Sequence, residues 1–129
     1  MERDVEKVME VYQSYAKKKI GAVLLLMSPE VEVVQSTELP WGGHYKGHEG
    51  LQQFLGKLNE HVDARVQIDR VIDAGDRVVA IGQTIGTTRS TKVQFEVPVV
   101  HVWTFVEAQI TRFEAYIDNA TMLAALRGG

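Results

Sequence analysis

The chain of 129 residues contains no cysteine, so it forms neither disulfide bonds nor metal sites built on thiolates. It also lacks an excess of basic residues, because 14 Lys and Arg stand against 17 Asp and Glu for a net charge of -3. A nucleic-acid-binding protein normally carries a basic patch, so this balance argues against such a partner. The longest apolar run, "AVLLLM" at residues 22–27, is far too short to cross a bilayer.

The amino-terminal segment lacks the features of a signal peptide. It is charged from its second residue and has neither an apolar stretch nor a cleavage site of small residues. No repeat, low-complexity segment or linker interrupts the chain, and the composition, 45% hydrophobic and 24% charged, is that of an ordinary globular protein. We therefore expect one cytoplasmic domain over residues 1–129, with no membrane or nucleic-acid partner.

In several segments, apolar residues at helical spacing alternate with charged ones. Proline or glycine separates these segments from one another. Helices are expected over residues 1–20, 22–28, 48–62 and 119–127. The second of these should stop at Pro29, because proline cannot continue a helix. In the third, Phe54 lies on the apolar face together with three leucines.

One strand pattern lies between the second and third helices, and four consecutive ones follow the third helix. Strands are expected over residues 31–36, 65–74, 77–88, 93–108 and 109–118. Helices first and hairpin-connected strands after them indicate an α+β fold, with the helices on one face of a mostly antiparallel sheet. Gly82 and Gly86 lie inside a predicted strand, where glycine marks a sharp bend. A sheet that curls this strongly, closed by helices, makes a cone with an interior.

Two segments carry a family resemblance: "ELPWGGHYKGHEGLQQFL" at residues 38–55 and "ITRFEAYIDNATMLAALRG" at residues 110–128. Together with the element order, they resemble the SnoaL-like polyketide cyclase group of the nuclear-transport-factor-2-like superfamily, which also holds ketosteroid isomerase. The resemblance implies a conical pocket walled by the curved sheet, usually in a homodimer. It says little about the reaction, because this scaffold hosts isomerases, cyclases, hydrolases and non-enzymatic modules.

The segment "VQFEVPVVHVWTF" at residues 93–105 is the most informative for a site. Because side chains alternate along a strand, His101, Trp103 and Phe105 share one face, with Pro98 a candidate bulge that would shift the pattern before them. His101 is then either a core histidine with a satisfied hydrogen bond or a pocket residue. By resemblance it falls where ketosteroid isomerases place an oxyanion-stabilising acid, and an imidazole can donate the same hydrogen bond.

The first helix and the glycine-rich segment after the first strand hold further candidates. The isomerases place a hydrogen-bonding tyrosine on this helix; Tyr15 is the better match and Tyr12 the other, although both phenols are also suited to plain packing. Trp41 is expected at the pocket rim, and His44 as a rim residue facing in. His44 and His48 do not sit one turn apart on a helix and have no third ligand, so we expect no metal.

Two carboxylates are candidates for proton transfer. The isomerases carry their general base before the glycine-rich loop, where an ungapped match places Glu38; a slipped match places Gln35 or Ser36 there instead, and neither is a base. The SnoaL-like cyclases take an acid–base aspartate from the C-terminal part, where Asp118 is the nearest carboxylate. The ordinary alternative is that Asp118 caps the last helix.

The remaining pocket candidates are neutral. Phe113 is expected to face inward from the last strand, and Gln83 to offer a hydrogen-bonding group inside the cone. Epoxide hydrolysis of the limonene type is disfavoured, because the residues of its water-activating machinery are missing, with Ala115 standing in the place of one aspartate.

Two functions remain open. One is a cofactor-independent acid–base enzyme of the isomerase or cyclase type, acting on a small apolar or polycyclic carbonyl compound. The other is a module that binds a hydrophobic ligand without turnover, or whose dimer surface carries the function. Under both we expect a homodimer through the outer sheet face, where Val100, Val102, Thr104 and Val106 lie.

Overall fold

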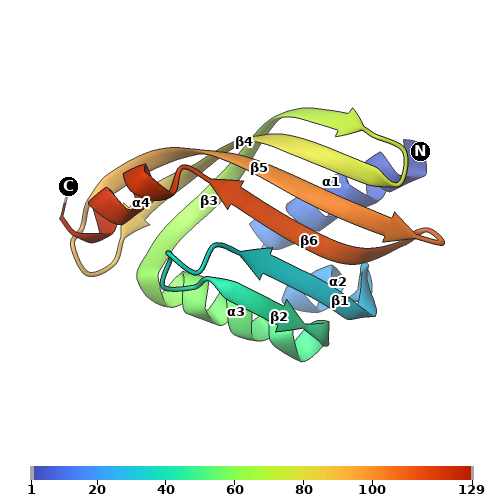
Figure 1. Ribbon diagram of the computed structural model, residues 1–129, viewed down its shortest axis with the longest axis horizontal. Coiled ribbons are helices and arrows are strands. Elements are labelled where there is room, and N and C mark those ends of the chain that lie inside the picture. The colour runs from blue at the N-terminus through green and yellow to red at the C-terminus, as the bar shows by residue number, and fades with distance from the viewer. Residues whose placement is uncertain (1, 129) are drawn as a thin grey trace.

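The computed structural model describes residues 2–128 and contains helices and strands in the predicted sequence order, with one strand more than expected (Figure 1). In chain order the elements are α1 (Glu2–Ala16), α2 (Ile20–Leu25), β1 (Met27–Gln35), β2 (Gly43–Lys46), α3 (Gly47–His61), β3 (Val62–Asp73), β4 (Arg77–Thr88), β5 (Gln94–Val106), β6 (Gln109–Ile117) and α4 (Asn119–Leu126).

All six strands belong to one sheet, in the order β2-β1-β6-β5-β4-β3. The strands from β3 to β6 form an antiparallel meander, and β2 pairs antiparallel with β1. The single parallel pair joins β1 to β6, the first long strand to the last. The sheet is therefore mixed and mostly antiparallel, as the sequence predicted.

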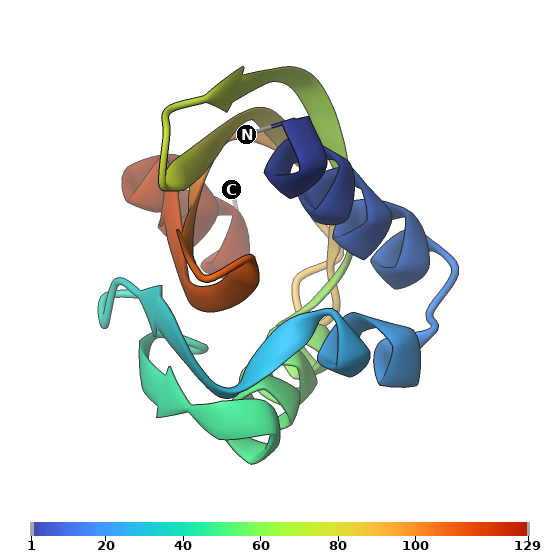
Figure 2. The ribbon, with the colours of Figure 1, turned by 90° about the vertical axis from the view of Figure 1, so that its right-hand side faces the viewer.

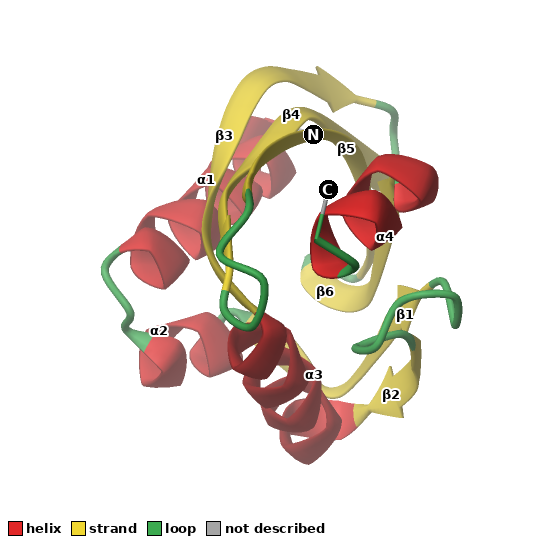
Figure 3. Ribbon diagram, turned by 90° about the vertical axis from the view of Figure 1, so that its left-hand side faces the viewer, coloured by secondary structure: helices red, strands yellow, loops and turns green. Residues whose placement is uncertain are grey.

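The sheet curls into a cone that the helices close. Viewed along the molecule from its two ends, the strands follow an arc around a central space (Figures 2 and 3). Helix α3 contacts β1 and β2 at one edge of the sheet and β3 at the other, while α1 contacts β3 and β4. The predicted cone-shaped α+β fold is confirmed.

The bend of β4 depends on its glycines. A Cβ on Gly82 would lie 1.9 Å from the carbonyl oxygen of Gln67 on β3, far inside van der Waals contact. The pairing of β3 with β4 shifts register next to this point, between Ile68 and Arg70. Glycine is needed here because only a residue without a side chain lets the two backbones approach so closely.

Several boundaries differ from those predicted, and the differences near the amino terminus change how the sequence is interpreted. Helix α1 ends at Ala16, and the lysine run that follows lies outside it, with Lys18 in the left-handed region at φ 60°. Helix α2 ends at Leu25, so Ser28 and Pro29 belong to β1 and do not terminate a helix. Pro29 is tolerated there because the register of β1 against β6 shifts between Met27 and Glu32, an irregularity of the kind that accepts proline.

The glycine-rich segment is only partly a loop, because Gly43–Lys46 forms the edge strand β2. Pro98 is not a bulge: β4 and β5 keep continuous register through its pairing with Gln83. The alternation of β5 is therefore unbroken, and Phe95, His101 and Trp103 are all buried on its inner face. Within residues 2–128, no helix is long and apolar enough to cross a membrane.

Candidate functional site

The cone contains a cavity of about 110 Å³ between its helices and the inner face of the sheet. Its walls are mainly apolar and aromatic, including Leu51, Phe54, Leu58, Trp103, Phe113 and Met122. A cavity of roughly 150 Å³ with apolar walls is known to take up a molecule of the size of benzene. The space in the cone is thus suited to one small ring, and a polycyclic compound needs the site to widen.

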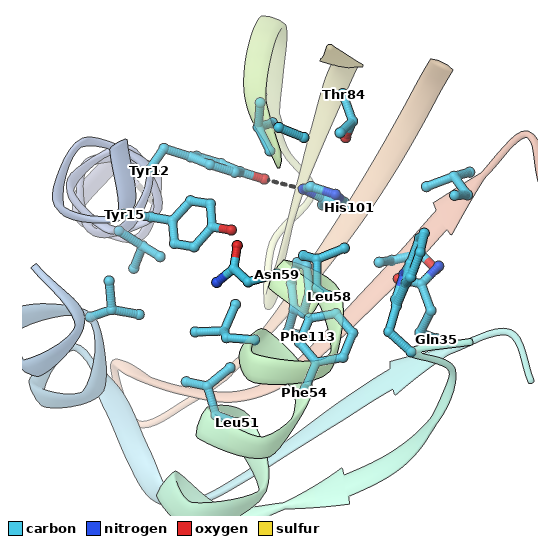
Figure 4. A pocket seen from close by; sticks show the side chains of 18 of the residues that line it. Tyr12, Tyr15, Gln35, Leu51, Phe54, Leu58, Asn59, Thr84, His101 and Phe113 are labelled. Atoms are coloured by element: carbon cyan, nitrogen blue, oxygen red, sulfur yellow. Dashed lines mark hydrogen bonds between the residues drawn. The ribbon is translucent and has the colours of Figure 1, made fainter. Parts of the chain in front are cut away.

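A chain of hydrogen bonds joins β5 to α1 across this cavity. The hydroxyl oxygen of Tyr12 lies 2.6 Å from Nδ1 of His101, and Nε1 of Trp103 donates to the same hydroxyl at 3.1 Å. Figure 4 shows the first of these contacts, with the Tyr12 side chain reaching from α1 toward the sheet. The Phe113 ring packs against both His101 and Trp103, with centroids 4.9 and 4.4 Å away.

The hydrogen-bond partners define which nitrogen of His101 carries the proton. Trp103 is a donor only, so the Tyr12 oxygen accepts from it, and the Tyr12 proton has Nδ1 of His101 as its one acceptor among the described residues. A neutral imidazole that accepts at Nδ1 carries its proton on Nε2. We therefore assign the hydrogen to Nε2, because this tautomer gives the Tyr12 proton an acceptor, whereas an Nδ1–H would leave it without one.

We infer that the Nε2 atom of His101 is open to the cavity. It has no hydrogen-bond partner among residues 2–128, where the one fully enclosed side-chain polar atom without a partner is Oδ1 of Asn119. His101 also lines the cavity and is only 6% exposed. An N–H group thus points into an apolar space with nothing to donate to, which suits it to an oxygen atom of a ligand.

Burial controls the charge of this site. It lowers the pKa of His101 from its ordinary value of 6.5 to about 4, since an apolar surrounding penalises the imidazolium form. Burial also raises the pKa of the Tyr12 hydroxyl, a shift that the hydrogen bond from Trp103 partly opposes. The pKa of Tyr15 is raised by burial as well. At neutral pH the three groups are therefore uncharged.

A second polar group faces the cavity two strands away from His101. Ala115 on β6 pairs with His101 on β5 and with Gln35 on β1, so the three residues form a row across the inner face. The amide nitrogen of Gln35 donates to the Ala115 carbonyl oxygen at 3.3 Å. All three residues line the cavity, so the small side chain of Ala115 lies between the imidazole of His101 on one side and the amide of Gln35 on the other.

No carboxylate side chain lies among the described residues that line the cavity. Glu38 is exposed, and its carboxylate accepts a hydrogen bond from Nδ2 of Asn119 at 2.9 Å. The inward position before the glycine-rich segment belongs to Gln35, as the slipped match allows. The structure thus places an amide, which is not a base, where an isomerase would need its aspartate.

Asp118 lies outside the cavity and caps α4. Its carboxylate accepts from the backbone N–H of Thr121 at 3.2 Å and from the Thr121 hydroxyl at 2.8 Å. These hydrogen bonds lower the pKa of Asp118, the side-chain bond from Thr121 most of all. The geometry is that of the helix-capping alternative.

The histidines of the glycine-rich segment are engaged away from the cavity. His44 is exposed on β2 and its Nε2 lies 2.8 Å from Glu32 Oε1, while His48 Nε2 contacts the Met27 carbonyl oxygen at 3.1 Å. Trp41, expected at the rim, is 2% exposed and forms part of the cavity wall. The alternation of β2 explains His44, because its neighbour Tyr45 takes the inward position.

Of the remaining predicted residues, Tyr15, Phe54 and Phe113 line the cavity together with Tyr12 and Trp103. Gln83 does not, since its amide points outward from β4 and donates to Asp69 at 2.9 Å. Its neighbour Thr84 takes the inward position. Asn59 from α3 also lines the cavity without having been anticipated. The roles of all these residues in binding or catalysis stay predictions.

Comparisons with known proteins agree with this architecture. The sequence profile of the SnoaL-like domain matches residues 5–113. An NTF2-like protein of unknown function from Burkholderia pseudomallei has 25% identity and a TM-score of 0.91, with 98% of each chain covered. TerC co-crystallised with polyporic acid has 26% identity and a TM-score of 0.89, over 97% of this chain and 98% of its own.

A third solved structure shares the fold at lower identity. It is a protein with a ketosteroid isomerase-like fold from Catenulispora acidiphila, in complex with trimethylamine; identity is 19% and the TM-score 0.81, over 95% of this chain and 92% of that one. The search among curated proteins found no match. The profile match covers most of the chain, so the chain belongs to the SnoaL-like domain family.

Proposed function

We propose that the protein binds a small, largely apolar carbonyl or phenol compound in its cone and promotes proton shifts in it, as an isomerase or cyclase does. The observation that carries the proposal is the Nε2–H of His101, held by Tyr12 and open to a cavity with apolar walls. A preorganised donor in such a site stabilises negative charge that develops on a carbonyl oxygen as an enolate forms, while the α-proton passes to solvent, because no carboxylate lines the cavity among the described residues.

Three features support this choice of ligand. The cavity holds one ring, its walls are aromatic, and the titratable groups that line it, His101, Tyr12 and Tyr15, are neutral at pH 7. A buried cavity without charge disfavours an ion at its base, because nothing there would compensate the lost hydration. A structure 26% identical to this chain, TerC, was co-crystallised with polyporic acid, which supports an organic ligand for this chain as well.

The test compares two ligands that differ by one oxygen, 4-ethylphenol and ethylbenzene, in wild type and His101→Ala. Binding is followed by the fluorescence of Trp41 and Trp103, both of which line the cavity. We expect His101→Ala to weaken the binding of 4-ethylphenol by about fivefold relative to that of ethylbenzene, since one neutral hydrogen bond contributes roughly 1 kcal/mol. Equal weakening of both ligands would show that His101 only shapes the cavity.

Two further variants control this experiment. Gln83→Ala removes a polar side chain from the neighbouring strand outside the cavity and should leave both affinities unchanged. Tyr12→Phe retains His101 but frees its Nδ1, so the imidazole tautomer is no longer held. We expect an intermediate loss of phenol affinity from this variant, and no loss would contradict the assigned hydrogen-bond chain.

A non-catalytic binding protein is the second candidate, and the lack of a carboxylate among the described lining residues favours it. Solvent deuterium exchange at the α-carbon of a small aryl ketone, followed by NMR, separates the two candidates. Exchange accelerated by wild type and lost in His101→Ala supports an enzyme. Saturable binding without acceleration supports the binding protein.

We also propose that two copies pair through the outer face of β5 and β6. Val100 lies next to Tyr116 in the register of these strands, and Tyr116 and Val106 are 54% and 56% exposed. Sedimentation velocity at micromolar concentration should give the mass of a dimer, and Val102→Glu, which places a charge in this face, that of a monomer. A wild-type monomer at that concentration would contradict the pairing.

A further inference from the structure

A second hollow lies directly outside the cavity. It is a groove of about 670 Å³ between the end of α1, the end of α3 and strands β3 and β4, which we call the outer groove. Five residues line both it and the cavity: Tyr12, Tyr15, Asn59, Ala64 and Val66. Because the two spaces share these walls, we infer that the outer groove is the mouth through which the cavity meets solvent.

The outer groove is charged where the cavity is neutral. Lys18, Arg65 and Arg89 line it, against the single carboxylate of Asp63. This local excess of positive charge stands out in a chain whose net charge is -3. None of the three cations forms an ion pair with another side chain in the part of the molecule that the structure describes.

The side chain of one of these cations is held in place, and the backbone of a second is fixed. The backbone N–H of Arg89 donates to the His61 carbonyl oxygen at 2.9 Å, and its side-chain Nε donates to the Asn59 carbonyl oxygen. This fixes the guanidinium at the end of α3, beside a residue that lines both spaces. Lys18 stands in a tight turn after α1, with its backbone N–H bonded to the Tyr15 carbonyl oxygen at 2.9 Å.

We propose that the ligand is amphipathic, with its ring in the cavity and a carboxylate in the outer groove, held by Lys18, Arg65 and Arg89. The arrangement offers two different binding groups to one ligand. A neutral hydrogen-bond donor lies in the cavity, and cations without an ion-pair partner lie at its mouth. A carboxylate at the mouth stays partly hydrated, so it gains attraction without the cost of full burial. This inference rests on the proposed function and names the substrate class.

The test uses two probes with the same ring and phenol oxygen, 3-(4-hydroxyphenyl)propanoate and its methyl ester, measured by calorimetry at low ionic strength. We expect wild type to bind the acid roughly fivefold more tightly than the ester, because exposed ion pairs are individually weak and several act together. In the double variant Lys18→Gln/Arg65→Gln, which retains Arg89, the preference for the acid should shrink toward equality, because binding of the acid alone is weakened. Asp63→Asn should increase the preference for the acid.

A matched control removes the same charge from elsewhere on the surface. Lys46→Gln/Arg70→Gln changes two exposed cations outside the outer groove and should keep the preference for the acid. Equal affinities in wild type, or a preference unchanged in Lys18→Gln/Arg65→Gln, would overturn the carboxylate site. If both probes then still bind and the affinity of each is lower in His101→Ala, the proposed function stands without the carboxylate site. If neither probe binds, both the proposed function and the carboxylate site are overturned.

Discussion

Lowering the pH from 7.5 to 4 is expected to reduce the free energy of unfolding by roughly 3 kcal/mol through His101 alone. In the folded protein the pKa of this group is about 4, because it is buried among aromatic rings, whereas the unfolded chain has the ordinary value of 6.5. Between these values the unfolded state binds more protons than the folded state. The stabilisation is therefore complete above pH 6.5 and is lost as the pH falls toward 4.

Urea unfolding of wild type and His101→Gln over this pH range measures the effect. Glutamine cannot ionise, so the variant should lose roughly 3 kcal/mol less than wild type over the same interval, whatever its stability at neutral pH. The other histidines and the carboxylates are common to both proteins, so their contributions cancel in the comparison. If the free energies of unfolding of wild type and His101→Gln changed with pH in parallel, this would contradict a neutral, buried His101.

Gly82→Ala is expected to destabilise the fold by about 3 kcal/mol, toward the upper end of what overpacking costs. The added methyl group would meet the backbone of β3, with the Gln67 carbonyl oxygen 1.9 Å away, and a backbone cannot turn aside as a flexible side chain can. Relief requires the two strands to separate at the bend, which opens the curvature that encloses the cavity. Urea unfolding at neutral pH measures the change.

Gly56→Ala is the matched control for this substitution. Gly56 lies within α3, and a Cβ built on it has no atom within 4 Å. Alanine is the better helix former, so we expect a gain of roughly 0.5–1 kcal/mol. A Gly82→Ala protein as stable as wild type, with the control behaving as expected, would show that the bend does not depend on the close approach.

Strand periodicity accounts for much of the site that the sequence predicts. The alternation of β5 alone places His101 and Trp103 on the inner face, and the alternation of β6 does the same for Phe113. The same argument applied to β1 would have brought in Gln35, which follows Val31 and Val33 on one face. It would also have excluded Gln83, because Gly82 and Thr84 occupy the inward positions beside it.

Residues outside regular strands were less predictable. Glu38 lies in the turn after β1, and Asp118 between β6 and α4, so no periodicity constrained either side chain. Both carboxylates are instead bound by nearby hydrogen-bond donors, Asn119 and Thr121, at the surface. A resemblance between families transfers a position only as accurately as its alignment, and in irregular segments a shift of a few residues moves the side chain out of the pocket.

The sequence by itself determined the fold class, the bend at Gly82 and the inward face of β5, because these depend on local periodicity and on the steric freedom of single residues. Only the tertiary structure decided that Tyr12 meets His101 across 89 positions of the chain, that Ala115 lines the cavity, and that Lys18, Arg65 and Arg89 gather at its mouth. These features depend on how tightly the sheet curls and on where α1 and α3 cross it. Both are determined by the packing of elements that are distant in the sequence.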